Sequence, residues 1–377
     1  RPKQAPAPKR SRRAGPRRVP GPTWGTAFAR TAVLIAVPAV VTAVLVQQVV
    51  VASTTSREDL ARGVDRKFAG YSHHETALRA ASTLPRGLAA YVAGLLWVQA
   101  SSIPGARINY FLGRVSGEGY FFYFPVALAV KLSTAVVLGL LAAAVAAAVG
   151  SMRRRAAVRR RKLRVLAARG LLPLALGAAY LGAAMLSNVN IGVRHVAPSV
   201  PLFLVAAAGV LRTTGRPRVR AAVAAVVVGL AALEAVPFLG REIPFGNVLA
   251  GGPPGVRRVL SDSNVEWGER LDAVFARASE GDLGRVGVVS LFWDAREGRA
   301  AGVARVDAVL PPEIETLFVS VFLWDLGSAI ERNRESYRKL DSIREWFVPV
   351  MREIRKAAVS VEPFGDAYLL IRLRPAS

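Results

Sequence analysis

The sequence predicts a polytopic α-helical membrane protein with about five transmembrane helices and a C-terminal extracytoplasmic α/β domain. Long apolar runs occupy residues 27–240, whereas the composition from residue 241 onward is that of a soluble domain. Hydrophobic residues make up 52% of the 377 residues, which is high for a soluble protein. Arg and Lys gather at the ends of the apolar runs, as they do on the cytoplasmic side of membrane spans.

A helix of roughly 20 apolar residues crosses a bilayer, and five segments qualify, of which the second is long enough to tilt and the fourth is short. The segments are Ala27–Ala52, Tyr120–Gly150, Leu171–Leu186, His195–Leu211 and Ala221–Leu239. A further apolar stretch, Leu84–Pro104, is interpreted as an interfacial or re-entrant helix. A sixth span there would move the basic cluster Arg153–Arg164 to the outer side, against the usual bias of Arg and Lys.

The net charge of +25 is concentrated in basic clusters at residues 10–18, 153–164 and 212–220. This distribution predicts a cytoplasmic N-terminus, a disordered basic tail over residues 1–26, an outer loop over 53–119 and an extracytoplasmic domain over 241–377. No signal-peptide pattern opens the chain. Because the composition favours a GC-rich bacterial genome, we expect a multi-pass protein of the bacterial cytoplasmic (inner) membrane. No aromatic-interleaved basic motif supports a nucleic-acid partner.

The C-terminal region alternates helical and strand patterns, which is typical of a small α/β layer domain. The S-x-x-E sequence Ser263–Glu266 predicts a capping box before a helix. That helix places on one face the residues Trp267, Leu271, Val274, Phe275 and Ala278. The other predicted elements are strands at Arg285–Phe292 and Thr316–Trp324, a helix at Glu335–Phe347 and a hairpin of Ala357–Glu362 with Ala367–Leu373.

Several enzyme classes are excluded by residue type. The chain has no cysteine and three histidines, so thiolate metal sites, disulfides and a closed zinc site are not expected. There is no P-loop lysine motif and no G-x-S-x-G elbow. The run His73-His74-Glu75 is interpreted as a solvated loop, and no cofactor is identifiable.

Two groups of residues near the apolar runs are candidates for a functional role. Lys131 lies inside the second run, where an ionisable residue is either functional or reaches outward to the interface. Arg194 and His195 begin the fourth run on its outer side, where the positive-inside bias predicts few cations. They either contact ordinary phospholipid or hold the phosphate of a lipid carrier, because the arginine fork fits phosphate oxygens.

Two outer segments are candidates for contacting the rest of a substrate. Glu118 and Tyr120 belong to a glycine-rich loop that precedes an aromatic run, which is either a loop entering a helix or the wall of a site for a lipid-borne substrate. Asp262, Asn264 and Trp267 open the outer domain, where they either cap a helix or face a sugar or pyrophosphate.

Four motifs occur in one order along the chain: Gly117–Pro125 with Lys131, Asn190–His195 with Pro198, Gly251–Pro253 and Asp262–Gly268. In this order the chain resembles the C-terminal half of bacterial GT-C glycosyltransferases, the group similar to protein O-mannosyltransferases and aminoarabinose transferases. The resemblance implies transfer of a sugar from a polyprenyl-phosphate carrier to an acceptor protein, lipid or glycan at the outer face. Arg194 and His195 would then hold the leaving phosphate, a role that a divalent metal ion could share.

The chain departs from that family in its first outer loop, where the family carries its catalytic carboxylate. Here Glu58, Asp59 and Asp65 lie in a highly charged, helix-like context, so no catalytic residue is assigned. We therefore expect a C-terminal fragment or a split or remodelled glycosyltransferase. The alternative is a non-catalytic membrane subunit whose outer domain binds a glycan or partner protein and which works with a separate catalytic chain. A transporter is disfavoured by the small number of intramembrane charges.

Overall fold

The computed structural model describes residues 41, 45, 51, 54–69, 71, 73–154, 160–212, 217–293, 295–333, 335 and 338–374. The chain divides into two compact units, unit 1 with residues 1–100 and unit 2 with residues 101–377. The predicted tail 1–26 lies outside the described residues, as does the first predicted span except for Val41, Leu45 and Val51.

Among its described residues, unit 1 has the helices α2 (Arg57–Phe68), α3 (His74–Thr83) and α4 (Arg86–Ser101). They pack through small side chains and a few aromatic ones, with Phe68 and Trp97 in edge-to-face contact at 5.5 Å between ring centroids. A helix, α4, forms within the stretch Leu84–Pro104, and the interfacial or re-entrant placement of that stretch stays a prediction. The histidine run opens α3, and His74 Nε2 lies 2.7 Å from a carboxylate oxygen of Asp65.

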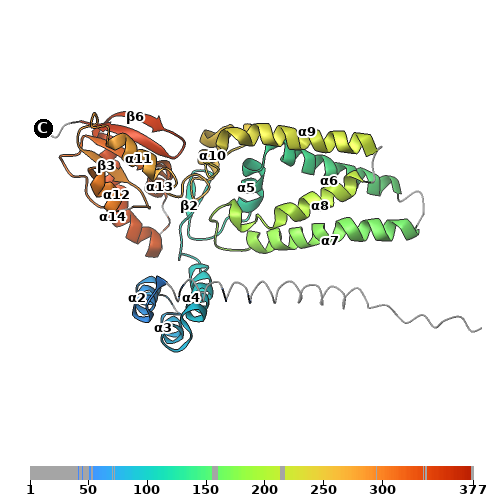
Figure 1. Ribbon diagram of the computed structural model, residues 1–377, viewed down its shortest axis with the longest axis horizontal. Coiled ribbons are helices and arrows are strands. Elements are labelled where there is room, and N and C mark those ends of the chain that lie inside the picture. The colour runs from blue at the N-terminus through green and yellow to red at the C-terminus, as the bar shows by residue number, and fades with distance from the viewer. Residues whose placement is uncertain are drawn as a thin grey trace, which may run out of the picture. The chain divides into compact units, whose positions relative to one another are not determined.

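The helical part of unit 2 is a bundle of helices (Figure 1). Its helices are α5 (Tyr123–Lys131), α6 (Thr134–Arg154), α7 (Arg160–Met185), α8 (Ser199–Leu211) and α9 (Pro217–Ala235). The end of α9 meets the start of α6, because the Glu234 carboxylate accepts hydrogen bonds from the N–H and hydroxyl of Thr134 at 2.6 and 2.8 Å. Arg212 and Arg220, where α8 ends and α9 begins, therefore lie at the opposite end of the bundle.

The prediction of about five transmembrane helices is wrong. Within the described ranges, one helix is long and apolar enough to cross a membrane, the 22 residues Pro217–Phe238 with a mean hydropathy of 2.1. The second predicted span, Tyr120–Gly150, is not one helix, because Leu132 adopts an extended conformation and separates α5 from α6.

The remaining apolar helices are too short to span by themselves. They are Thr134–Val149, Leu171–Met185 and Ser199–Leu211. At about 1.5 Å per residue, apolar helices of 10–17 residues measure roughly 15–26 Å, less than the hydrocarbon core of about 30 Å. The apolar segments identified in the sequence are therefore longer than the apolar parts of the helices that form there.

The C-terminal part of unit 2 is a five-stranded mixed sheet in the order β4-β3-β5-β7-β6. The strands are β3 (Val286–Val289), β4 (Val303–Arg305), β5 (Thr316–Ser320), β6 (Ala358–Phe364) and β7 (Tyr368–Leu373). β3 pairs in parallel with β4 and β5, whereas β7 is antiparallel to β5 and to β6. The predicted C-terminal hairpin is present as β6–β7. The two predicted internal strands contain the shorter strands β3 and β5.

Helices cover both faces of the sheet, because successive strand residues point to opposite sides. Phe318 and Tyr368 pack toward α11 (Leu271–Ala278), while Leu317 and Ile371 belong to the core shared with α13 (Val321–Arg332). The elements α12 (Ala295–Ala300) and α14 (Arg338–Ala357) complete the domain. Of the face predicted from periodicity, Leu271, Val274, Phe275 and Ala278 are buried in α11, whereas Trp267 lies before the helix and is 45% exposed.

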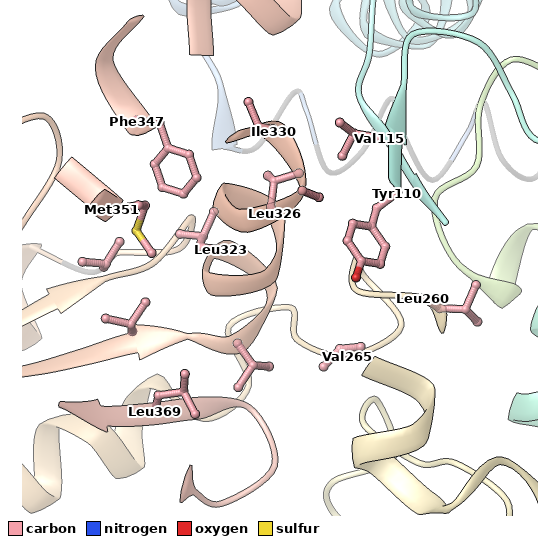
Figure 2. Packing of buried hydrophobic residues seen from close by; sticks show 14 of the residues in the cluster. Tyr110, Val115, Leu260, Val265, Leu323, Leu326, Ile330, Phe347, Met351 and Leu369 are labelled. Carbon is pink, nitrogen blue, oxygen red and sulfur yellow. The ribbon is translucent and has the colours of Figure 1, made fainter. Parts of the chain in front are cut away.

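One hydrophobic core joins the sheet domain to the helical part within unit 2. Tyr110 and Val115, from the hairpin of β1 (Asn109–Phe111) and β2 (Arg114–Ser116), lie across from Leu326 and Ile330 of α13 (Figure 2). The helix α10 (Gly252–Val259) also belongs to this joining region. A hydrogen bond from Asn333 Nδ2 to the Val115 carbonyl at 2.6 Å connects the end of α13 to the β1–β2 hairpin. The candidate site lies in this joining region.

Candidate functional site

A buried polar network holds together three segments that are far apart in the sequence. The Tyr123 hydroxyl, at the start of α5, donates to the Asp262 carboxylate and accepts a hydrogen bond from Asn264 Nδ2 at 3.0 Å. The other carboxylate oxygen of Asp262 accepts from the backbone and side-chain amides of Asn264 at 2.7 and 2.8 Å. Burial raises the pKa of Asp262 to about 6, and burial beside Asp262 raises the pKa of Tyr123 well above its usual range.

The network fixes the turn that carries Arg194 and His195. The backbone N–H of Gly192 donates to the Tyr123 hydroxyl at 2.9 Å, and that of Val193 donates to Asn264 Oδ1 at 2.8 Å. The 3-10 turn η1 (Val193–His195) follows directly. Gly192 has a φ of +97°, a conformation that side chains disfavour, and is buried against this network. Arg194 and His195 therefore follow a segment that hydrogen bonds hold in place, and both are exposed at the surface.

The Arg194 guanidinium stacks on the indole of Trp267, with 4.5 Å between Cζ and the ring centroid. Such contacts stabilise by about 0.5–2 kcal/mol, depending on how far the cation is desolvated. Trp267 is 45% exposed and also contacts Phe292, with centroids 5.0 Å apart. In the described part of the chain no carboxylate forms an ion pair with Arg194. Arg194, His195 and Trp267 are called the cation cluster below.

His195 lies in a positive field. Partial desolvation, and then the charges of Arg194 and Arg107, lower the pKa of His195 below its usual value. A positive potential of this kind disfavours a further proton and favours an anion. The arrangement can therefore bind a phosphate or another anion through the exposed guanidinium and the neighbouring imidazole.

Lys131 is buried at the end of α5, under the network. Its ammonium donates to the carbonyls of Ile243, Phe245 and Asn264 at 2.5, 2.6 and 2.8 Å, which accounts for its three N–H groups. Burial lowers the pKa of Lys131 to about 8, against the opposing charges of Asp262 and Glu269. The ammonium therefore holds three backbone segments together and does not reach outward to an interface. A functional role for Lys131 stays a prediction.

Backbone contacts join Glu118 and Tyr120 to the segments around Asn109 and Asn190. Asn109 Nδ2 donates to the Glu118 carbonyl at 3.1 Å, and the Tyr120 N–H donates to Asn190 Oδ1 at 2.5 Å. The Glu118 residue is exposed, whereas the Tyr120 ring packs on Phe111 and burial raises its pKa to about 12. The loop is thus attached to the segment that leads into Gly192.

The predicted capping box at Ser263–Glu266 does not form, because the helix α11 begins only at Leu271. Glu266 instead lies 1% exposed inside the protein, where its carboxylate accepts from the Ser320 hydroxyl at 2.8 Å and from the Gly268 N–H at 2.7 Å. Trp267 consequently lies in a loop that the buried Glu266 carboxylate anchors, and not on the helix α11.

The structure brings six of the eight predicted binding residues around one network: Arg194, His195, Lys131, Asp262, Asn264 and Trp267. Tyr123 and Asn190 were not predicted. Tyr123 was counted with the aromatic run assigned to the membrane interface, and its partner Asp262 lies 139 residues away. The available signal was that both residues lie inside the motifs that carry the resemblance, Gly117–Pro125 and Asn190–His195.

Two carboxylates of the loop that carries Trp267 are enclosed by the protein. Asp262 and Glu266 are buried and engaged with protein donors, so neither carboxylate is exposed beside Arg194. Among the described residues, no group of three or more His, Asp or Glu side chains could hold a metal ion.

No protein-family model, curated protein or solved structure matches this chain.

Proposed function

We propose that this chain is the carrier-binding portion of a bacterial membrane glycosyltransferase that uses a sugar linked to polyprenyl phosphate. The observation that carries the proposal is the exposed Arg194 guanidinium, which stacks on Trp267 and has no carboxylate partner among the described residues. A guanidinium oriented in this way can donate two parallel hydrogen bonds to a phosphate. His195 adds a donor on the same turn.

Placement at a membrane is part of the proposal and is supported by α9. Its apolar window has no buried residue, and side chains such as Val228 and Leu233 are 67% and 73% exposed. An apolar helix without a protein cover is stable in hydrocarbon and costly in water. The cation cluster and the arginines Arg212 and Arg220 lie at opposite ends of the bundle, which agrees with an extracytoplasmic cluster.

The test is sugar transfer from a polyprenyl-phosphate donor in native membranes that contain the full chain. Arg194→Ala should abolish transfer while the amount of chain in the membrane fraction is unchanged. Arg212→Ala is the matched control, because it removes an exposed arginine from the other end of the bundle. Transfer by Arg194→Ala at the rate of the control would refute the assigned role.

The second candidate is a non-catalytic subunit that holds the carrier for a separate catalytic chain. It is favoured by the buried, hydrogen-bonded state of Asp262 and Glu266, which leaves neither carboxylate as an exposed base at the cluster. This candidate predicts that a multispanning catalytic chain co-purifies with the protein. Turnover by the purified chain alone would instead assign catalysis to it.

A further inference from the structure

A cavity of about 360 Å³ lies between α2 and α4 in unit 1, and no residue of the cation cluster lines it. Its volume falls within the roughly 300–1,000 Å³ that is usual for ligand sites in proteins. Much of its wall consists of small residues, Gly63 of α2 and Ala90, Ala93 and Gly94 of α4. In the part of the chain that the structure describes, a Cβ atom built on Gly63 or Gly94 would have no neighbour within 4 Å beyond its own stretch of helix. Both glycines therefore border open space.

The larger side chains that line the cavity are mostly apolar, among them Leu60, Val64, Phe68 and Trp97. A water molecule is held in a protein by two to four polar partners, which an apolar wall does not supply. The wall therefore favours an apolar ligand. At roughly 30 Å³ each, about the volume of a water molecule, some twelve methylene groups fill 360 Å³. That length corresponds to most of one acyl chain.

Lys67 places a positive charge at the rim of the cavity. Its Nζ lies 4.9 Å from the ring centroid of Trp97, and both residues line the cavity. Among the described residues, no carboxylate forms an ion pair with Lys67. The acidic residue of the wall, Asp59, is engaged by the Ser56 hydroxyl and by Arg62 Nη2, each at 2.6 Å. The rim therefore presents a cation that complements an anionic headgroup.

The helix α4 gives a membrane lipid access to the cavity. It has no charged residue after Arg86, and Leu95 on its surface is 55% exposed. An apolar helix that carries Tyr91 and Trp97 is suited to the headgroup level of a membrane. Gly94 belongs to the cavity wall and is also exposed, so the cavity opens on this surface of α4. An acyl chain can enter from there.

We propose that the cavity between α2 and α4 holds one acyl chain of an anionic membrane phospholipid, whose phosphate contacts Lys67. The apolar wall favours the chain, the volume limits it to one, and the lysine favours a negative headgroup. This inference goes beyond the proposed function, because it uses no residue of the cation cluster and concerns a bound phospholipid instead of the sugar carrier.

The experiment is photo-crosslinking of the full chain in phosphatidylcholine nanodiscs that contain a trace of phospholipid with a diazirine on one acyl chain. The two probes are phosphatidylglycerol and phosphatidylcholine, which differ in headgroup charge. Mass spectrometry should locate crosslinks on the residues of α2 and α4 that line the cavity. Phosphatidylglycerol should label them about fivefold more strongly, the effect of one lysine near a bilayer surface. Lys67→Gln should remove this preference, and the exposed Lys356→Gln should retain it.

Filling the cavity separates it from the outer surface of the helices. Gly63→Leu and Gly94→Leu should each reduce labelling by at least about tenfold, since every displaced methylene lowers affinity about fourfold. Both variants replace a helical glycine, so the thermal midpoint should not fall. Gly182→Leu is the matched control, at a glycine of α7 with equally open surroundings.

Three results would overturn the inference. They are the absence of labels from α2 and α4, labelling that both leucine variants leave unchanged, and equal labelling of the unmutated chain by the two headgroups. Arg194→Ala should not alter labelling of the cavity, so the proposed function and this inference can fail separately.

Discussion

The backbone N–H of Gly192 donates a hydrogen bond to the hydroxyl of Tyr123 at 2.9 Å. This contact joins the turn before Arg194 to the first residue of α5. The Asp262 carboxylate, in the loop before Trp267, accepts a hydrogen bond from the same hydroxyl. Three distant segments of the chain thus meet at one oxygen atom. The position of the cation cluster depends on that meeting point, which makes it the first target for mutation.

Tyr123→Phe should lower stability and weaken anion binding together. The substitution leaves the Gly192 N–H, an Asn264 amide proton and an Asp262 oxygen without this partner. Buried groups left unsatisfied cost about 1–3 kcal/mol. The thermal midpoint of the chain in nanodiscs checks this expectation. Tyr180→Phe, at a 45% exposed position on α7, is the control and should behave as the unmutated chain does. Equal midpoints for both variants would contradict the role of Tyr123.

Asp262 should make stability fall as pH rises from about 4 to about 6. Burial raises its pKa to about 6 in the folded chain, above the value of about 3.9 expected after unfolding. Between these values the folded state binds more protons than the unfolded state, so its advantage is complete below pH 4 and lost by about pH 6. The difference in thermal midpoint between the unmutated chain and Asp262→Asn should follow this course. A difference that is constant with pH would count against the buried carboxylate.

Phosphate binding should raise the pKa of His195. In the free protein partial desolvation and the charges of Arg194 and Arg107 lower it, and an anion at the cluster opposes those charges. Titration of the imidazole proton signals by NMR, with and without inorganic phosphate, measures the change. The chain has three histidines, so His195→Gln assigns the signal. Arg194→Ala should raise the same pKa without phosphate. A His195 pKa that changes neither with phosphate nor in Arg194→Ala would show that the anion binds elsewhere.

Lys131→Met should destabilise the joint between α5 and the loops at Ile243, Phe245 and Asn264. Three carbonyls lose a charged donor, and each lost contact of this kind costs about 1.5–3 kcal/mol when the acceptors stay buried. Lys131→Arg should restore little, because a planar guanidinium does not match acceptors that surround a compact ammonium. Thermal unfolding of the two variants provides the comparison. Full stability of the methionine variant would show that the ammonium is not needed as a clamp.

Val228→Asp should prevent membrane insertion of α9. Val228 is 67% exposed in the middle of this helix, and an aspartate at the centre of a span costs about 2.5–3.5 kcal/mol. Val309→Asp, at a 70% exposed position in the sheet domain, is the matched control. Carbonate extraction of membranes should release the first variant and retain the second. Retention of both would argue against hydrocarbon around α9.

Local patterns predicted the elements whose stability is local. The β6–β7 hairpin and the buried face of α11 follow from alternation and periodicity, and both are present. The five spans were wrong because hydropathy counts apolar residues and does not detect the break at Leu132. The capping box was wrong for a similar reason, since Glu266 finds its partner Ser320 54 residues away.

The candidate site was predictable in its residue types and not in its roles. Arg194 and Trp267 were separate candidates, and only the fold places one guanidinium on the other residue's indole. Lys131 was expected either to act in the membrane or to reach outward, yet three backbone carbonyls surround it. Long-range pairing of this kind carries no signal in a single sequence.

The most direct measurement is the affinity of polyprenyl phosphate for the full chain in nanodiscs, with Arg194→Ala and the control Arg212→Ala. Loss of a charge-assisted contact to phosphate should weaken binding to Arg194→Ala by at least about tenfold, whereas Arg212→Ala should bind as the unmutated chain does. Equal affinities for the two variants would contradict a carrier-binding role for the cation cluster.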